Sequence, residues 1–394
     1  MHNVLIVGGG FGGIRAAQLL SKNRQLSIRL IDPKSYMEYH AAVYRLVTGR
    51  SATETCIPYS ELLKGRKVEL VKDSVSAIDL TTKTATGVSG SRYSYDSLIL
   101  AVGSETSYFG IKGVEEHSYG IKTIDEALRL KRHIHDIFSS VKNAKPDEKA
   151  PALHIVVIGG GASGVELAGE LASYTRTVAR KNAVDTSLIT IDLIEAMPRV
   201  LPQLPENVSK RTLARLRTLG VNVLLNRSVV KEEQDQLFLK DMQMTAKTIV
   251  WTAGMKANRL ASMVPGITVD KRGRAIVDAS LSVTDHNGVY VIGDAAATKF
   301  SGMAQTALSD AAYVASAIAA KAAGKKVAAY VQPAPAYSVP VGPRWAATVY
   351  HGVQFFGFIG WCMRRAADFR AFASLLPLTA AFRAYIGGST VIDE

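Results

Sequence analysis

The sequence predicts an α/β protein made of two similar βαβ units, one nested inside the other, followed by a C-terminal segment of different composition. Three observations support this fold class. A glycine-rich turn follows a short apolar run twice, in "VLIVGGGFGG" and in "IVVIGGGASG". A further apolar run, "GVYVIGD", ends in Gly-Asp late in the chain. Residues 331–394 hold 11 of the 29 aromatic residues, which marks them as a separate segment.

The first unit begins at the N-terminus, where the run "VLIV" predicts a strand and the residues after the glycines follow a helical pattern. Gly8, Gly10 and Gly13 form a GxGxxG motif. The first glycine allows a tight turn, the second lets the backbone approach a pyrophosphate, and the third lets the helix pack on the strand. The next strand ends in Asp32, 19 residues after Gly13, where an acid binds ribose hydroxyls. The motif predicts a dinucleotide site, with a purely structural turn as the alternative.

The second unit repeats this pattern with Gly159, Gly161 and Gly164, and its strand "TIDLIE" ends in Glu195. Both units are therefore predicted to be Rossmann-type dinucleotide-binding domains, with a pyrophosphate at each helix N-terminus. Two such sites in one chain predict two cofactors that meet, a flavin and a nicotinamide nucleotide. Glu195 favours NADH, because a carboxylate there repels the 2′-phosphate of NADPH. Arg199 would weaken that preference if the loop folds back.

The nested order predicts where the domains begin and end. The stretches "SLILAVGSET" (97–106) and "TIVWTAGMKAN" (248–258) are interpreted as the two crossings between the units. We therefore expect a discontinuous FAD-binding domain over 1–112 and 266–330, an NAD-binding domain over 113–265, and a tail over 331–394. A chain of 394 residues is long enough for two or three such domains.

These motifs, in this order, resemble the flavoproteins with two dinucleotide-binding domains. Within them the chain is similar to the type II NADH dehydrogenases and to the apoptosis-inducing-factor-like quinone reductases, which include the ferroptosis suppressor. The stretch "HAAVYRLVTGRSATETCIPYSEL" (40–62) resembles both branches. The resemblance implies an NADH:quinone oxidoreductase in which non-covalent FAD takes a hydride from NADH and passes electrons to a quinone without proton pumping.

The resemblance also implies roles for individual residues. Asp294 would bond the ribityl chain of FAD, and Gly254 would contact NAD. Further FAD contacts are implied at Lys34, Val75, Ala101, Gly103 and Ala304. Glu166 would lie beside the nicotinamide, with a helix-start carboxylate that faces the helix dipole as the alternative. Gln305 would contact the quinone, with helix capping or polar pairing in the core as the alternative. The type II enzymes carry an AQxAxQ segment, but this chain has Ser309 at the last glutamine of its "AQTALSD".

The cysteines argue against one branch of the resemblance. Cys56 and Cys362 lie far apart, and the chain has no CxxC pair. This pattern predicts neither a disulfide framework nor a zinc site, and we expect no metal. It also argues against the disulfide reductases, which pass electrons through a cysteine pair beside the flavin. Two alternatives stay open: a soluble NAD(P)H-dependent reductase of a small redox protein, and a non-enzymatic sensor that binds flavin and NADH.

The tail is predicted to be a Pro-rich extended connector over 331–343 followed by a helix. In that helix an apolar stripe lies opposite three charged residues, Arg364, Arg365 and Asp368. The members of the stripe are Phe355, Phe358, Ile359, Cys362, Ala366, Phe369 and Phe372. Its apolar run is too short to cross a bilayer, so the stripe predicts either a helix lying in the membrane interface or a packed or dimer-forming face. The two upstream units are expected to fold without the tail.

The net charge of +13 favours an anionic partner, such as membrane lipid, nucleic acid or a phosphorylated ligand, with a merely basic solvated surface as the alternative. The chain has no nucleic-acid-binding motif, so an anionic membrane surface is the expected partner, together with the quinone. The sequence therefore predicts a cytoplasmic protein that is peripheral on the membrane surface, with a homodimer as a further possibility.

Overall fold

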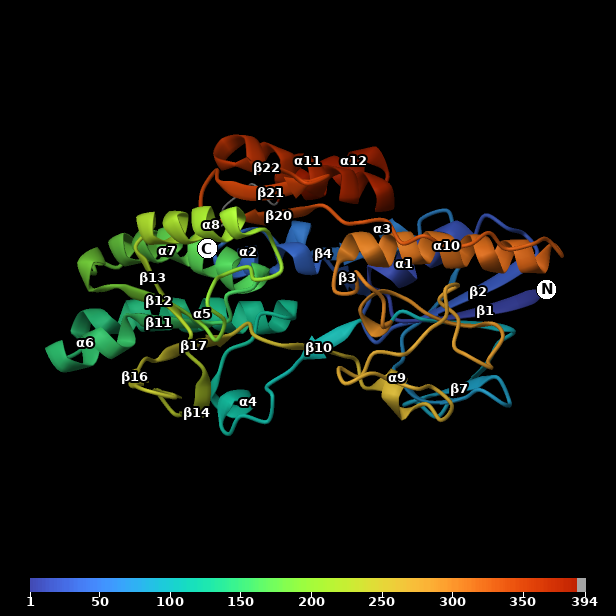
Figure 1. The fold of residues 1–394 in the computed structure, drawn as a ribbon, viewed down its shortest axis with the longest axis horizontal. Coiled ribbons are helices and arrows are strands. Elements are labelled where there is room, and N and C mark those ends of the chain that lie inside the picture. Colours follow the sequence, from blue (N-terminus) through green and yellow to red (C-terminus); the bar gives the residue numbers. More distant parts are fainter. Residues whose placement is uncertain (388–394) are drawn as a thin grey trace.

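The structure is a computed structural model that describes residues 1–387, and it places two α/β lobes beneath the C-terminal segment (Figure 1). The first lobe is built on a parallel sheet with the strand order β19-β9-β1-β2-β5. Its strands are β1 (His2–Val7), β2 (Leu26–Ile31), β5 (Glu69–Val71), β9 (Ser97–Leu100) and β19 (Val289–Val291). Helices α1 (Phe11–Leu20) and α10 (Ala304–Ala322) pack side by side along it (Figure 1).

The second lobe repeats this architecture with a parallel sheet of order β13-β12-β11-β17. Its strands are β11 (His154–Ile158), β12 (Thr190–Glu195), β13 (Val221–Leu225) and β17 (Thr248–Trp251), and its main helices are α5 (Ile124–Ser140), α7 (Ala162–Lys181) and α8 (Glu206–Thr218). In the central strands, residues 4–7 of β1 and 155–158 of β11 are all apolar and buried, as is typical of parallel strands covered on both faces.

Each lobe also carries a small antiparallel sheet and short elements. The small sheet of the first lobe is β6 (Val75–Asp79), β7 (Thr84–Gly87) and β8 (Arg92–Ser94), and that of the second is β14 (Val229–Glu233), β15 (Gln236–Leu239) and β16 (Gln243–Thr245). The short elements are β3 (Tyr36–Glu38), β4 (Cys56–Pro58), α2 (Val43–Val47), α3 (Tyr59–Leu62), α4 (Val114–His117), α6 (Pro146–Ala152) and α9 (Leu260–Met263).

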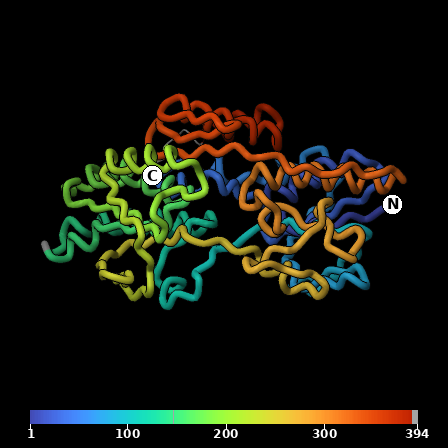
Figure 2. The backbone as a smooth tube through the Cα atoms, in the orientation of Figure 1, coloured from blue at the N-terminus to red at the C-terminus, as the bar shows by residue number. Residues whose placement is uncertain are grey.

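Two extended segments cross between the lobes, and Figure 2 shows them side by side. They are β10 (Ser104–Thr106) and β18 (Met255–Ala257), which pair antiparallel. Both fall inside the stretches that the sequence identified as crossings. The strands of the first sheet come from both ends of the chain, and those of the second come from the segment between the crossings.

The tail forms a third layer across both lobes (Figure 1). It consists of a meander, β20 (Tyr337–Pro340), β21 (Ala346–Tyr350) and β22 (Val353–Phe356), then helices α11 (Gly357–Leu375) and α12 (Leu378–Gly387). The prediction of one helix through Phe355 was therefore wrong, because Phe355 lies in a strand. Gly360 explains how α11 lies on the meander: a Cβ there would be 2.3 Å from the carbonyl oxygen of Ala346.

Helix α11 presents its charged face to the protein. Arg364, Arg365 and Asp368 are buried, and each is at most 8% exposed. Phe358 and Ile359 are 59% and 64% exposed. The prediction placed these charges opposite the apolar stripe, which is correct: the three charges face the protein, whereas Phe358 and Ile359 face outward. Phe372, the last member of the predicted stripe, is fully buried, so the exposed stripe ends before it.

The tail shares the hydrophobic cores of both lobes. Val341 and Val349 belong to the core cluster of the second lobe, and Phe372 belongs to that of the first. The connector also approaches α7 closely, because a Cβ on Gly169 would lie 2.7 Å from the backbone nitrogen of Gly342. The expectation that the two units fold without the tail stays a prediction, and the structure argues against it, because removing the tail would expose apolar side chains of both cores.

Candidate functional site

Two glycine turns have the same backbone geometry at the carboxyl ends of their central strands. Strand β1 leads to Gly8 (φ +100°) and β11 leads to Gly159 (φ +114°), and both backbones are left-handed. A Cβ on Gly13 would lie 1.8 Å from the Gly8 carbonyl oxygen, and one on Gly164 would lie 1.9 Å from that of Gly159. Only glycine lets each helix, α1 or α7, approach its strand this closely.

The middle glycine of each turn faces open space. A Cβ on Gly10 or Gly161 would meet no atom within 4 Å. Each of these residues immediately precedes a helix whose first N–H groups have no partner within the helix. An anion beside either glycine would meet these N–H groups and the positive end of the helix dipole. The residues of both turns therefore fit a pyrophosphate group.

An acid at the end of the neighbouring strand closes each turn. Asp32 accepts a hydrogen bond from Gly9 N at 2.7 Å, and Glu195 accepts one from Gly160 N at 2.5 Å. Each acid also accepts a bond from the N–H two residues further along its own chain, at 2.8 and 2.7 Å. Because each carboxylate oxygen has a second lone pair, both acids can still accept hydrogen bonds from a ribose.

The loop after Glu195 uses the guanidinium of Arg199. Arg199 donates to the carbonyl oxygen of Leu204 at 2.7 Å and to Ser209 Oγ at 2.9 Å, and it also donates to the carbonyl oxygen of Pro202. These contacts hold the arginine within its own loop. Arg199 would weaken the preference for NADH only if its loop folded back towards the nucleotide. In this structure that condition is not met.

Asp294 lies in the 3₁₀ turn that follows β19, at the carboxyl edge of the first sheet. Its Oδ2 accepts a bond of 2.6 Å from Ser104 Oγ, and its Oδ1 accepts one of 3.2 Å from Gly302 N. The Nζ of Lys122 donates to the same Ser104 Oγ at 3.0 Å. Burial lowers the pKa of Lys122. Asp294 is thus connected to the first crossing between the lobes and to a lysine of the second lobe.

The other residues predicted to contact FAD lie in different settings. The carbonyl oxygen of Ala101 touches the first glycine turn, and Gly103 has φ +69° with open space beside it. Ala304 is the first residue of α10, two positions after the Gly302 that bonds Asp294. By contrast, Lys34 pairs with Glu38 at 2.7 Å, and Val75 packs under the first sheet.

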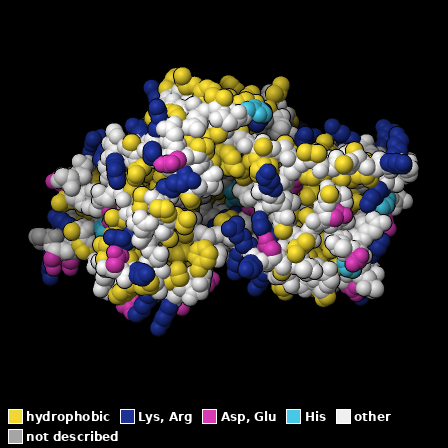
Figure 3. Space-filling model, viewed as in Figure 1, with side chains coloured by type: hydrophobic (Ala, Val, Ile, Leu, Met, Phe, Trp, Pro, Cys, Tyr) yellow, Lys and Arg dark blue, Asp and Glu magenta, His cyan; other side chains and the backbone are white. Residues whose placement is uncertain are grey.

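A polar cavity of about 950 Å³ lies between the lobes beside the two crossings. Its lining includes His40, Ser104, Lys122 and Lys256, and Figure 3 shows Lys and Arg side chains gathered at this gap. Burial and the charge of Lys122 lower the pKa of His40 to about 4, so the imidazole is neutral at pH 7. Gly254 (φ +74°) lies in the second crossing, where a Cβ would be 2.5 Å from the ring of Phe109.

Glu166 and Gln305 are both engaged with the tail. Glu166, on α7, accepts a bond of 3.0 Å from Arg364, and burial raises its pKa to about 7 although Arg364 opposes this. The side-chain amide of Gln305 donates to the carbonyl oxygen of Ala336 at 3.0 Å and accepts from the N–H of Ala336 at 3.3 Å. Ser309 Oγ donates to the backbone carbonyl oxygen of Gln305 at 3.0 Å.

Comparison with known proteins places the chain in a family. Residues 2–327 match the family described as pyridine nucleotide-disulphide oxidoreductase. The type II NADH:quinone oxidoreductase Ndh of Mycobacterium tuberculosis is 34% identical over 382 residues, which cover 91% of this chain and 82% of that protein. The chain belongs to the type II NADH:quinone oxidoreductase family.

Two further comparisons agree with this family. The type II NADH:quinone oxidoreductase of Staphylococcus saprophyticus is 28% identical, and the match covers 75% of this chain and 74% of that protein. The fold is that of NDH2 from Plasmodium falciparum, solved in complex with NADH, with a TM-score of 0.88. That match has 19% sequence identity and covers 98% of this chain and 97% of the other.

The structure also reveals a buried ionic cluster that the sequence did not predict. Its members are Arg45, Glu54, Glu166, Arg364, Arg365 and Asp368. Arg45 binds Glu54 at 2.5 Å and Asp368 at 3.3 Å, which joins α2 to the tail helix. The available signal was the spacing of Arg364, Arg365 and Asp368, which places these three charges on one face of the helix. A helix that packs on protein must pair such charges with acids, because unpaired buried charges are costly.

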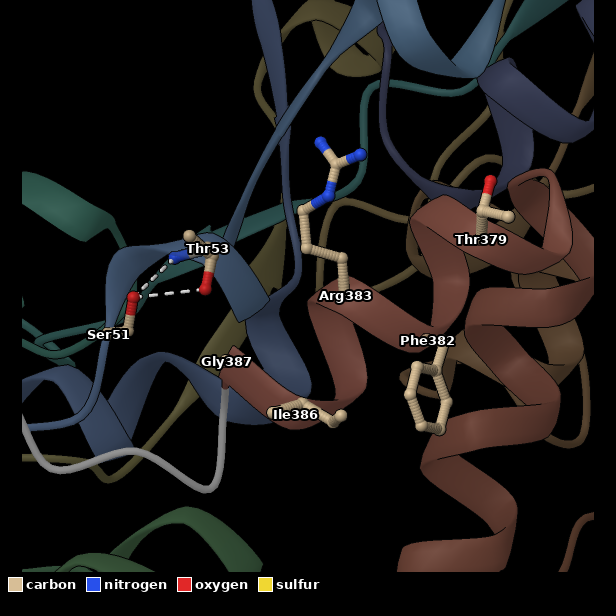
Figure 4. Close-up of a pocket in the computed structure, with 7 residues that line it drawn as sticks. All are labelled: Ser51, Thr53, Thr379, Phe382, Arg383, Ile386 and Gly387. Atoms are coloured by element: carbon tan, nitrogen blue, oxygen red, sulfur yellow. Dashed lines mark hydrogen bonds between the residues drawn. The ribbon is translucent and has the colours of Figure 1, made fainter.

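A second cavity, of about 480 Å³, lies where α12 meets the first lobe (Figure 4). Its lining includes Phe382, Arg383 and Ile386 from α12 and Ser51 and Thr53 from the loop opposite. The hydroxyl groups of Ser51 and Thr53 bond each other at 3.0 Å. This lining is mainly apolar and fits a hydrocarbon chain better than a nucleotide.

Proposed function

We propose that this protein is an FAD-dependent NADH:quinone oxidoreductase. The observation that supports this best is the duplicated glycine turn, with an acid closing each copy, in a chain of the type II NADH:quinone oxidoreductase family. FAD, when bound, takes a hydride from NADH and passes two electrons to a quinone. We infer that no proton pumping accompanies this reaction.

The first turn is the proposed site of FAD. Gly8 and Gly13 shape the turn, and Gly10 leaves room for the pyrophosphate at the N-terminus of α1. Asp32 accepts hydrogen bonds from the adenosine ribose, and Asp294 accepts them from the ribityl chain. Ala101, Gly103 and Ala304 supply backbone near these groups. The contacts of Lys34 and Val75 add no support for the predicted role of either residue in binding FAD.

The second turn is the proposed site of NADH. Gly159, Gly161 and Gly164 shape it, and Glu195 accepts hydrogen bonds from the 2′- and 3′-hydroxyl groups of the adenosine ribose. We infer that NADPH is a poorer substrate, because its 2′-phosphate would face Glu195 while Arg199 is held by its own loop. Gly254 lies in the second crossing on the nicotinamide side, and Glu166 orients the nicotinamide.

The acceptor site is proposed at the tail side of the flavin. Gln305 begins α10 beside the proposed flavin site, but its amide bonds the connector at Ala336. We therefore infer that Gln305 contacts a quinone only through its remaining donor, or that it positions the connector. The second cavity, beneath α12, has an apolar lining that suits the hydrocarbon tail of a quinone.

The exposed face of the tail is the proposed membrane-docking surface. Its members are Phe358, Ile359, Leu378, Phe382 and Ile386, each 47% to 70% exposed, and Figure 3 shows hydrophobic side chains along this edge. Burying such a side chain fully would contribute about 1.5–3 kcal/mol. Among the described residues no helix has the length and hydropathy needed to span a bilayer. We infer a peripheral position on an anionic membrane, led by apolar burial because Arg364 and Arg365 point inward.

The proposed function is tested with purified protein, a short-chain ubiquinone and NADH. The protein should carry non-covalent FAD, and NADH should be oxidised with quinone as acceptor, faster than NADPH. Flavin-containing protein that transfers no electrons to quinone would contradict the proposal, and reduction of a small redox protein instead would favour a soluble reductase. No electron transfer at all would favour a sensor.

The docking surface is tested separately with Phe358→Ser/Ile359→Ser and anionic phosphatidylglycerol vesicles. Wild-type protein should co-sediment with the vesicles and the double variant should not, while both reduce the short-chain quinone at the same rate. If the double variant instead converts a dimer to a monomer, with no change in vesicle binding, the face is a contact between two copies of the chain.

A further inference from the structure

Arg364 of the tail helix joins four separate segments at one buried point. Its Nη1 donates to Glu166 Oε1 at 3.0 Å and to the Ser338 carbonyl oxygen at 2.8 Å. Its Nη2 donates to the carbonyl oxygen of Ala41 at 2.9 Å, and its Nε donates to Asp368 at 2.9 Å. These partners belong to α7 of the second lobe, the meander of the tail, the segment after β3 in the first lobe, and α11 itself.

The arrangement needs a guanidinium group. Arg364 is 8% exposed and uses three nitrogens to donate four hydrogen bonds in fixed directions. Lysine has one nitrogen on a flexible stem and cannot reach these partners together. The planar fork therefore fixes the Glu166 carboxylate relative to Ala41, which follows the cavity-lining His40.

Several charged or titratable groups surround Glu166. Arg364 and Asp368 face it from α11, Arg45 and Tyr44 face it from α2, and Glu170 lies one turn further along α7. Arg364 is the strongest of the cations that oppose the burial effect on the pKa of Glu166. Removing Arg364 would therefore raise this pKa further and favour the protonated carboxyl group at neutral pH.

We propose that Arg364 is a positioning residue for the NADH half-reaction, so that the tail completes the site at which NADH reduces the flavin. The inference rests on the proposed function, in which Glu166 lies beside the nicotinamide. Glu166 belongs to the second lobe, but the group that orients it comes from outside both nucleotide units. The tail thus has a part in the chemistry in addition to any part in docking.

The experiment follows the two half-reactions of the FAD-loaded protein by rapid mixing. Flavin bleaching by NADH is measured from pH 5.5 to 9, and reoxidation by a short-chain ubiquinone is measured in parallel. The variants are Arg364→Gln, Arg364→Lys, Glu166→Gln and the double variant Arg364→Gln/Glu166→Gln. Arg370→Gln is the matched control, because Arg370 lies on the same helix but is exposed.

In Arg364→Gln, flavin reduction at pH 7 should slow roughly tenfold or more, and the midpoint of its pH profile should rise by about one unit. Arg364→Lys should keep the midpoint but slow reduction roughly two- to fivefold, because the charge stays and the fork is lost. Glu166→Gln should abolish the titration, and Arg364→Gln should then cause little further loss. Reoxidation and the Arg370→Gln protein should match wild type.

Additive losses in the double variant, or a pH midpoint that does not move in Arg364→Gln, would overturn the proposal and leave Arg364 with a structural role only. If Arg364→Gln does not fold, Arg364→Lys decides: equal slowing of both half-reactions, or wild-type rates in both, also overturns it. Wild-type flavin that NADH fails to bleach would instead contradict the proposed function, whatever the variants do.

Discussion

The glycine turns and helix α11 are held in place by opposite kinds of contact. In the turns, backbone meets backbone: a Cβ on Gly13 would lie 1.8 Å from the carbonyl oxygen of Gly8, five residues away. In α11, long charged side chains meet partners from distant segments, and Arg364 bonds a glutamate 198 positions earlier. The turns depend on the absence of side chains, whereas α11 depends on a set of side chains that must all be present.

This difference affects how each region responds to change. A steric contact in a turn fails when an atom is added. A buried ionic cluster fails when a partner is removed, because the remaining charge has neither water nor a counter-ion. A buried ion pair is therefore a weak source of stability but a sensitive one: replacing both partners by apolar groups can be neutral, whereas removing one partner costs about 3–5 kcal/mol.

The largest expected effect on stability comes from removing the part of the tail that includes α11 and its buried charges. A chain that ends at Pro343 lacks Val349 and Phe372, which pack into the two cores, and it lacks the tail arginines that pair with Glu54 and Glu166. It should lose cooperative unfolding altogether, since the whole stability of a domain is only about 5–15 kcal/mol. Circular dichroism and size-exclusion chromatography measure this. A truncated chain with the same melting curve as wild type would show that the tail does not contribute to the stability of the two lobes.

A smaller effect follows from removing one member of the cluster. Asp368→Ala removes the acid that Arg364, Arg45 and Arg365 share, so three buried guanidinium groups lose a partner. The free energy of unfolding should fall by about 3–5 kcal/mol. Arg383→Gln is the matched control, because the Arg383 side chain is 72% exposed and its ion pair with Glu61 is 3.7 Å long. Urea titration should separate the two variants clearly, and similar losses would contradict the special role of burial.

The same contrast explains what the sequence predicted. Gly8, Gly13 and the acid after the second strand predicted the turn geometry, because those steric requirements involve neighbouring residues. The position of Arg364 was not predictable in the same way. From the sequence alone, the charged residues of α11 could equally form a solvent-exposed polar face. They point inward because their partners Glu54 and Glu166, in other segments of the chain, pair with them. The contacts of Gln305 were not predictable for the same reason, because its partner Ala336 lies 31 positions later in the chain.

The pH dependence of stability tests the ionic cluster without removing atoms. Burial raises the pKa of Glu166 to about 7, above its value of about 4.3 in an unfolded chain. Folding therefore favours the protonated form, so this group's contribution is full below pH 4 and is lost as the pH rises through 7. Relative to Glu166→Gln, wild type should lose up to about 3 kcal/mol between pH 5 and pH 8. Parallel curves for the two proteins in urea titrations would contradict this shift.

The smallest expected change in stability belongs to the turns, and it separates two glycines of one motif. Gly13→Ala should lower the free energy of unfolding of the flavin-free protein by roughly 1–3 kcal/mol, because the new methyl group overlaps the Gly8 carbonyl. Gly10→Ala should leave that free energy unchanged, because no protein atom lies within 4 Å of the new group and the backbone φ of −75° suits alanine.

Gly10→Ala should nevertheless lower FAD occupancy, since the methyl group would enter the space proposed for the pyrophosphate. The absorbance of bound flavin after gel filtration measures this occupancy, and Gly161→Ala, in the second turn, is the matched control that should retain FAD. Unchanged occupancy in Gly10→Ala would mean that the open side of the first turn is a structural feature, with the flavin held elsewhere. Loss of FAD without loss of stability would show that this glycine is required by the ligand, whereas Gly13 is required by the fold.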